Sequence, residues 1–129
     1  MAKGSTFKTC ACRDEHRKLL RSRCPKLRRR DGRWSTTHGN WAYQLELPPT
    51  PSGARRNPLR RSGFTDQTTA ENEMTHAKTL LALADGDEVT RIQIADLINA
   101  TVRATKHLPN TEEVRRKIRT GRDLSKTIT

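Results

Sequence analysis

The three cysteines of the chain lie within one segment that is rich in arginine and lysine. Cys10 and Cys12 are one residue apart, eleven residues separate Cys12 from Cys24, and thirteen separate Cys24 from His38. A structural zinc ion takes four sulfur or nitrogen ligands in a tetrahedron, and three cysteines with one histidine are a standard set. In an extended strand, residues i and i+2 point to the same side, so Cys10 and Cys12 could reach one ion. The spacing therefore predicts a zinc site formed by Cys10, Cys12, Cys24 and His38.

Other interpretations of the cysteines stay open at this level. His16, four residues after Cys12, is a second candidate for the fourth ligand. The neighbouring cations favour the thiolate that zinc binds, but they would equally favour a redox-sensitive thiol. Three reduced thiols without a metal form the closest alternative, because an odd number of cysteines argues against a disulfide framework.

Neither His76 nor His107 has partners that suit a catalytic cysteine or serine. If no zinc binds, we expect residues 13–37 to be largely disordered.

The charge of the chain is concentrated in its first half. The net charge is +12; residues 1–64 hold sixteen Lys and Arg against four Asp and Glu, whereas residues 65–129 hold ten of each. Clustered cations gain affinity for nucleic acid by releasing counterions from phosphates. The basic half has no amphipathic helix with large apolar anchors, which a membrane-surface segment would need. No apolar run is long enough for a membrane span, so we expect a soluble, cytoplasmic, nucleoid-associated protein that binds no small-molecule substrate.

The elements expected in the first half are strands. Residues 6–12 predict a short strand, and residues 13–39 predict an irregular basic loop broken by Pro25, Gly32 and Gly39. NWAYQLEL alternates, with Trp41, Tyr43, Leu45 and Leu47 on one face and Ala42, Gln44 and Glu46 on the other, which is typical of a half-buried strand. Residues 48–53 predict a turn and residues 54–64 a returning strand. Because Pro58 cannot donate to a ladder, that strand lies at an edge or is interrupted there.

The second half predicts helices. One helix carries an apolar stripe and ends at Asp85-Gly86, with Thr68 and Glu71 as a capping box; its stripe consists of Ala70, Met74, Ala77, Leu81 and Ala84. A second helix is expected over residues 88–105 and a short third one from Thr111, which would be its cap. Residues 121–129 are polar and predict no structure of their own. With only 32% apolar residues, the chain can form at most a small core, supported by a staple or a partner.

The basic strand and the basic loop form the candidate nucleic-acid surface. A small sheet or ribbon fits the major groove of DNA, where arginine can read guanine and glutamine can read adenine. From the residues alone, contact with phosphates is favoured over base reading. The candidate DNA contacts are Gln44, Arg55, Arg56, Arg60 and Arg61 in the hairpin and Arg28, Arg29 and Arg30 in the loop.

Several short motifs, taken together, resemble a known family. CxCR, RCPKLRRR, HGNWAYQLELPP and RRNPLRRSGF, followed by RIQIADLI and LPNTEEVRRKIRTGRDL, are similar to the N-terminal arm-type DNA-binding region and connector of actinobacterial tyrosine-recombinase integrases of phages and mobile elements. The resemblance implies an α+β fold: a three-stranded antiparallel sheet backed by one helix, followed by a short helical connector. It implies that residues 1–86 bind duplex DNA at arm sites and that residues 87–129 lead to a core-binding domain.

The same resemblance shows what the chain lacks. Integrases of this family carry a catalytic arginine, a His-x-x-Arg motif and a nucleophilic tyrosine in a later domain, and none of these is present. Tyr43, the sole tyrosine, lies on the apolar face of the expected strand, so we interpret it as a core residue. We therefore expect a DNA-binding, non-catalytic fragment or truncated form of a recombinase.

Two further function classes remain. The helical half could be a protein-interaction module that contacts recombinase protomers or a directionality factor. The apolar residues of the second helix cover more of its surface than one stripe, which leaves apolar surface for a partner. A small ribosome- or RNA-binding zinc protein would suit the charge but would not explain the neutral helical half.

Overall fold

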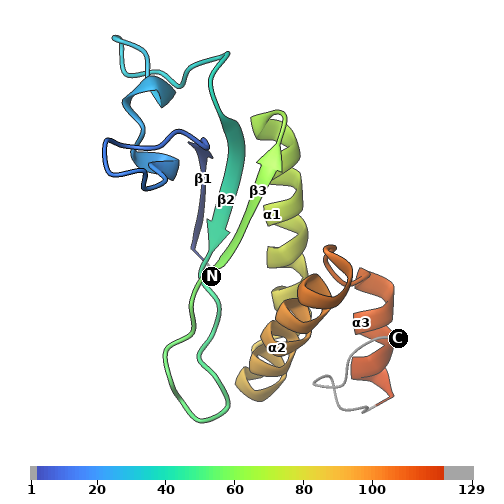
Figure 1. Cartoon of the computed structure of the whole chain (residues 1–129). Helices are drawn as coiled ribbons and strands as arrows, with labels where there is room; N and C mark the ends of the chain where they lie inside the picture. Colours follow the sequence, from blue (N-terminus) through green and yellow to red (C-terminus); the bar gives the residue numbers. More distant parts are fainter. Residues whose placement is uncertain (1–2, 121–129) are drawn as a thin grey trace. The chain divides into compact units, whose positions relative to one another are not determined.

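The computed structural model describes residues 3–120. It contains three strands, β1 (Gly4–Thr9), β2 (Asn40–Leu45) and β3 (Leu59–Phe64), two short 3-10 turns, η1 (Arg21–Arg23) and η2 (Pro25–Leu27), and three helices, α1 (Gln67–Ala82), α2 (Glu88–Thr105) and α3 (Thr111–Arg119) (Figure 1). The strands form one antiparallel sheet, so the expected α+β fold is confirmed. The polar tail expected over residues 121–129 lies outside the described residues.

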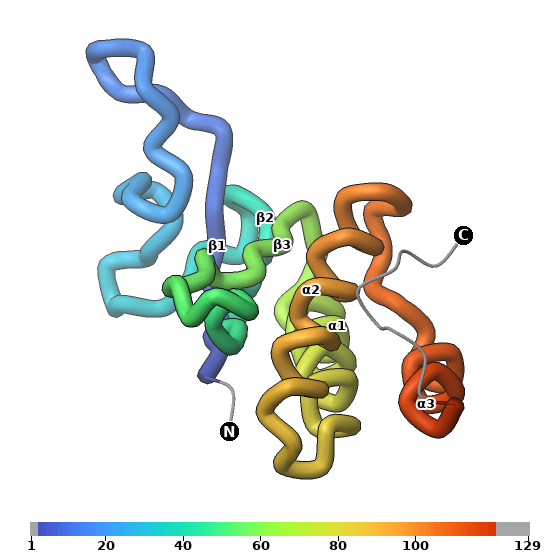
Figure 2. Tube along the Cα trace, turned by 90° about the horizontal axis from the view of Figure 1, so that it is seen from below, coloured from blue at the N-terminus to red at the C-terminus, as the bar shows by residue number. Residues whose placement is uncertain are grey.

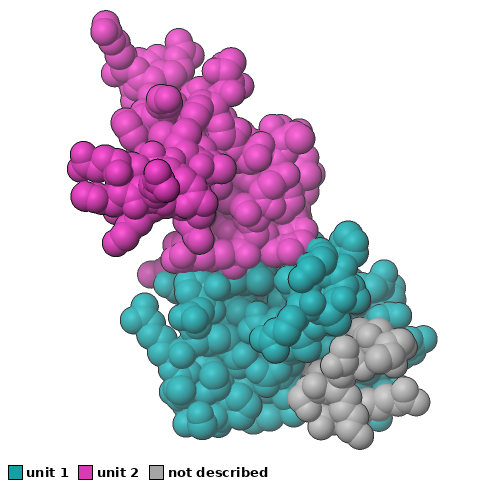
Figure 3. Space-filling view, in the orientation of Figure 1, with its two compact units in different colours: residues 1–2, 46–59, 75–129 teal, residues 3–45, 60–74 magenta. Residues whose placement is uncertain are grey.

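The chain forms two compact units, which are coloured separately in Figure 3. The sheet unit comprises residues 3–45 and 60–74, and the helical unit comprises residues 46–59 and the described residues from 75 onwards. Both units are therefore discontinuous in sequence, and α1 contributes to each. The expected division into a DNA-binding part (residues 1–86) and a connector (residues 87–129) concerns function, and it stays a prediction.

The sheet has the order β1-β2-β3, so β2 is its central strand. β1 runs antiparallel to β2, with Phe7 opposite Ala42, Lys8 opposite Trp41 and Thr9 opposite Asn40. Tyr43 and Leu45 are fully buried, as the alternation predicts. Ala42 was expected on a free face, but it is only 1% exposed. Arg21 and Ser22 of η1 lie near Ala42, since all three line one hollow.

Both outer strands are shorter than the sequence predicts. β1 ends at Thr9 rather than at Cys12, because the backbone then turns to pair with the basic loop: the Cys10 amide donates to the Arg21 carbonyl oxygen. β3 begins only at Leu59, directly after Pro58, and lies at the sheet edge, where a residue without an N–H is tolerated. The expected turn is present, and its Gly53 amide donates to the Thr50 carbonyl oxygen.

The apolar stripe of α1 is confirmed, but the cap of the helix differs from the prediction. Ala70, Ala77 and Leu81 are buried, as are the other stripe positions. Asp66, not Thr68, supplies the cap, since its Oδ1 accepts from the Thr69 amide and hydroxyl at 2.7 and 2.8 Å. These hydrogen bonds hold the pKa of Asp66 below its usual range, and the bond from the Thr69 amide has the larger effect.

The helical unit is formed around α2. α2 has the predicted bounds, is capped by Asp87, and buries Ile94, Leu97 and Ile98. Figures 1 and 2 show α2 beside the C-terminal part of α1. Asn110 caps α3 by accepting from two backbone amides, so Thr111 is the first helical residue rather than the expected cap. Within residues 3–120, every helix is too short or too polar to cross a bilayer.

Tyr43 belongs to the core of the sheet unit, as expected. Its hydroxyl donates to Glu73 Oε2 of α1 at 2.6 Å, and Arg61 Nε donates to the same oxygen at 3.1 Å. Its ring also contacts Phe64, with ring centroids 5.8 Å apart. These contacts hold α1 against one face of the sheet.

We predict that the stability of the sheet unit falls in strong alkali because of Tyr43. Burial, with the hydrogen bond to Glu73 as the second cause, raises the pKa of Tyr43 well above its usual value. The unfolded chain releases this proton near pH 10, whereas the folded chain retains it, so stability is full below pH 10 and falls as the pH rises further. The slope for one group is about 1.4 kcal/mol per pH unit. Tyr43 is the sole tyrosine, so tyrosinate absorbance should appear only with unfolding, and Tyr43→Phe should remove this contribution to the slope.

Candidate metal centre

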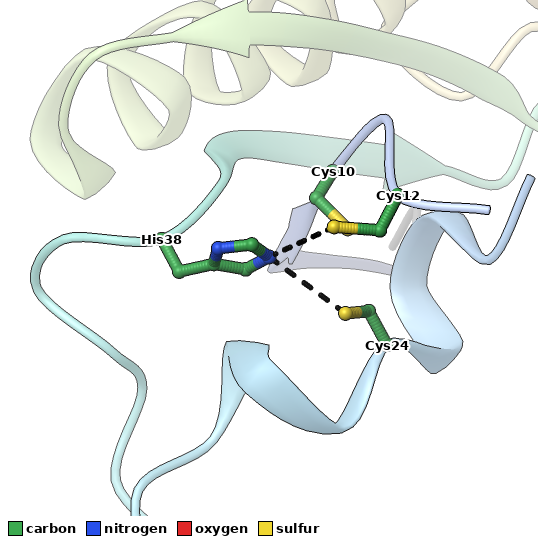
Figure 4. Close-up of side chains that lie close together, drawn as sticks. All are labelled: Cys10, Cys12, Cys24 and His38. Atoms are coloured by element: carbon green, nitrogen blue, oxygen red, sulfur yellow. Dashed lines mark hydrogen bonds between the residues drawn. The ribbon is translucent and has the colours of Figure 1, made fainter. Parts of the chain in front are cut away.

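The four residues that the sequence predicts as metal ligands lie together in the sheet unit. The ligand atoms of Cys10, Cys12, Cys24 and His38 are all within 4.8 Å of one another (Figure 4). The His38 Nε2 atom is 3.5 Å from Cys12 Sγ and 3.7 Å from Cys24 Sγ. Cys24 is buried, and the other three are half-buried. The structure therefore contains a Cys/His cluster that could hold a metal ion.

Two distances within this cluster can be compared with those of a tetrahedral zinc site. Zinc lies about 2.3 Å from thiolate sulfur and about 2.0 Å from imidazole nitrogen. In a regular tetrahedron these bond lengths place sulfur and nitrogen about 3.5 Å apart and two sulfurs about 3.8 Å apart. The distances from His38 Nε2 to the two sulfurs agree with the first of these values. With all four ligand atoms within 4.8 Å of one another, the cluster could hold one four-coordinate ion.

His16, the alternative fourth ligand, lies away from the cluster. Its side chain is 75% exposed, and its Nε2 atom lies 3.5 Å from the Glu15 carboxylate. It sits in a small turn where Asp14 Oδ1 accepts from the amides of His16 and Lys18. Of His16 and His38, it is therefore His38 that lies in the cluster.

The basic loop between the ligands is more regular than expected. Residues 13–19 form a small hairpin with an isolated bridge between Arg13 and Leu19. Residues 27–35 form a second one, in which the Ser35 amide donates to the Leu27 carbonyl oxygen at 2.7 Å. Between Thr9 and Asn40 the segment has no strand or α-helix, as expected of a loop, but turn residues such as Asp14 and Gly32 close two short hairpins within it.

Each ligand lies at an end of one of these small elements. Cys12 precedes the first hairpin, and its carbonyl oxygen accepts from the Leu20 amide at 2.9 Å. Cys24 lies between η1 and η2. His38 follows the second hairpin, where Ser35 Oγ accepts from its amide at 3.1 Å. A metal ion at this point would tie both hairpins to the end of β1.

Aromatic and cationic side chains support the second hairpin. The Arg28 guanidinium stacks on Trp34 at 3.5 Å from the ring centroid, and Trp34 meets Trp41 edge to face with centroids 5.7 Å apart. Lys8, only 3% exposed, lies over the Trp41 ring and donates to the Ser35 carbonyl oxygen at 2.6 Å. Sequence reasoning missed these contacts, since neither Lys8 nor Trp34 belongs to a motif that predicts such a pairing.

Gly39 positions the last ligand, and we predict that Gly39→Ala weakens metal binding. Gly39 has φ +78°, and a Cβ there would lie 2.6 Å from both the Thr9 carbonyl oxygen and Leu27 Cδ2. Backbone cannot yield at such a distance, so His38 would be displaced. We expect a loss of about 1–3 kcal/mol in stability and a lower metal affinity, measured by competition with a chelating dye. Gly32→Ala, where φ is also positive but no atom lies within 4 Å, is the matched control.

The candidate DNA contacts fall into two groups. Arg29, Arg30, Arg55 and Arg60 are exposed, and Gln44 is half-buried. The other three arginines are engaged within the chain: Arg28 with Trp34, Arg61 with Glu73, and Arg56 with Asp96. Arg56 also donates to the carbonyl oxygens of Pro48 and Pro49 at 2.9 and 3.1 Å. The exposed cations are distributed over both units.

Comparison with known protein families, with curated proteins and with solved structures found no match. The cluster and the charge distribution therefore carry the functional argument.

Proposed function

We propose that the chain is a zinc-supported module that binds double-stranded DNA, the N-terminal arm-binding part of a site-specific integrase. The observation that supports it most is the cluster of Cys10, Cys12, Cys24 and His38, which ties a strongly basic segment to a small sheet. Residues 13–37 contain ten Lys and Arg against three Asp and Glu. A rigid cationic surface of this kind fits a polyanion with regularly spaced phosphates.

Zinc is the metal that suits this ligand set best. Three thiolates and one imidazole are soft to borderline donors, whereas magnesium and calcium take oxygen ligands. A set of four protein ligands leaves no open position for a substrate or a catalytic water, so the ion is structural. Its role is to hold the basic hairpins in place, since Cys24 and Leu27 are the only buried apolar residues between Cys12 and His38.

Duplex DNA is favoured over a protein partner. Within the described residues, Val89 is the only large apolar side chain that is strongly exposed, so α2 and α3 offer no wide apolar surface for a second protomer. The apolar positions of α2 that suggested such a surface are buried or half-buried within the helical unit. The sheet, by contrast, carries exposed Arg60 on β3 and half-buried Gln44 on β2.

The proposal is tested by DNA binding as a function of salt. The zinc-loaded chain is titrated onto a fluorescent random-sequence duplex of about 20 base pairs between 50 and 300 mM salt. The logarithm of the affinity should fall linearly with the logarithm of the salt concentration, by about 0.9 for each phosphate neutralised. Selection from a pool of random duplexes then tests sequence preference. Absence of duplex binding at 50 mM salt, or an affinity that does not change with salt, would contradict the proposal.

A further inference from the structure

A hollow of about 450 Å³ lies on the sheet unit, between η1 and the strands. Phe7 and Ala42 are opposite each other in the β1–β2 register, and they line it together with Arg60 of β3. Tyr43 and Arg61, their neighbours in the strands, bond to Glu73 of α1. Because successive strand residues point to opposite faces, this hollow lies on the sheet face opposite α1.

The lining of the hollow is cationic and rich in hydroxyl groups. Arg21 of η1 and Arg60 of β3 both line it, and neither guanidinium has a partner among residues 3–120. Arg61 also borders the hollow, but its guanidinium is engaged with Glu73. Thr9, Ser22 and Ser62 add three hydroxyls, and no acidic residue is present in the lining. Guanidinium groups bind phosphate with charge-assisted, often paired hydrogen bonds, and hydroxyl groups can donate to the remaining oxygens.

We propose that this hollow is a phosphate pocket, in which Arg21 and Arg60 together hold one phosphate of the DNA backbone. The inference rests on the proposed function, which it refines. It assigns DNA contact to Arg21, a residue that no motif indicated, and it places η1 and the sheet on the same strand of the duplex.

The metal centre positions one half of this pocket. Arg21 lies three residues before Cys24, and its carbonyl oxygen accepts from the Cys10 amide at 3.3 Å, with Cys10 Sγ 3.8 Å away. Arg21 also has a positive φ of 52°, which an untethered chain would not retain. Loss of the metal should therefore remove Arg21 from the pocket while leaving Arg60 on β3.

A double-mutant cycle on the zinc-loaded chain tests the pocket. Arg21→Gln, Arg60→Gln and the double variant are titrated with the same duplex over the same salt range. Because the phosphate is held only when both guanidinium groups engage it, each single variant should lower the salt slope by about 0.9, the value for one phosphate. The double variant should lose little more than either single one, because both side chains hold the same phosphate. In metal-stripped protein, Arg21→Gln should have no further effect.

Arg23 supplies the matched control. It lies in the same 3-10 turn and is exposed, but it does not line the hollow. The effects of Arg23→Gln and Arg60→Gln should add independently. Zinc content near one ion per chain in every variant shows that the turn remains folded.

Two other outcomes would separate the phosphate pocket from the proposed DNA binding. If the chain binds duplex DNA but the effects of Arg21→Gln and Arg60→Gln add fully, or leave the slope unchanged, the phosphate pocket is wrong and the proposed function stands. If the unaltered chain does not bind duplex DNA, both fall.

Discussion

Cys24→Ser is expected to abolish stoichiometric metal binding and to unfold residues 10–38. Cys24 is the most buried of the four ligands, at 4% exposure, and it joins the two 3-10 turns that connect the hairpins. Structural zinc sites contribute about 10–16 kcal/mol of apparent binding free energy, which is also folding free energy for the segment they hold. The measurements are zinc per chain by mass spectrometry and amide hydrogen exchange over residues 10–38, which should lose its protection.

His16→Ala is the matched control for that experiment. His16 belongs to the same basic segment, but its side chain is exposed and lies outside the cluster. This variant should keep one zinc ion per chain and unaltered exchange. A Cys24→Ser protein that still binds one zinc ion per chain would contradict the proposed ligand set. So would a metal-free unaltered chain in which residues 10–38 remain fully protected.

Asp96→Ala is expected to destabilise the helical unit by about 2–3 kcal/mol. Arg56 is 9% exposed at its side chain and donates to Asp96 Oδ1 at 2.7 Å. Removing one partner of a buried ion pair leaves an uncompensated charge, which costs about 3–5 kcal/mol when both groups are fully buried. The lower value is expected here, because Asp96 is 28% exposed. Urea denaturation followed by circular dichroism measures the change.

Arg55→Ala separates structural from DNA-contacting arginines. Arg55 is adjacent to Arg56 but exposed, so its removal should leave the free energy of unfolding within about 0.5 kcal/mol of the original while lowering the salt slope of DNA binding. An Asp96→Ala variant as stable as the unaltered chain would mean that the ion pair with Asp96 does not hold Arg56. Arg56 would then return to the candidate DNA contacts.

Elements with a periodic apolar pattern could be predicted from the sequence. The stripe of α1 and the bounds of α2 follow from spacing at three and four residues, and Tyr43 and Leu45 follow from alternation. The ligand set could also be predicted, since three cysteines and a histidine at the start of a strand offer few other combinations. Cys10 and Cys12 were expected to share one side of an extended strand, but β1 ends at Thr9, before both of them.

Other features depend on contacts between residues far apart in the sequence. The partner of Arg56 is forty residues away, and the hydrogen bond between Tyr43 and Glu73 spans thirty. The two hairpins of the basic segment have no apolar alternation, and Ala42 lies near η1, a turn that no periodicity predicts. The caps at Asp66 and Asn110 were each missed by one or two positions, since several adjacent residues could serve as caps.

The most direct test of the central claim is X-ray absorption at the zinc edge on the chain purified without chelator, with zinc per chain measured on the same sample. We predict one zinc ion with three sulfur neighbours at about 2.3 Å and one nitrogen neighbour at about 2.0 Å, a pattern that Cys24→Ser abolishes and His16→Ala preserves. A sample without bound zinc, or a zinc ion surrounded only by oxygen and nitrogen, would contradict a metal centre formed by Cys10, Cys12, Cys24 and His38.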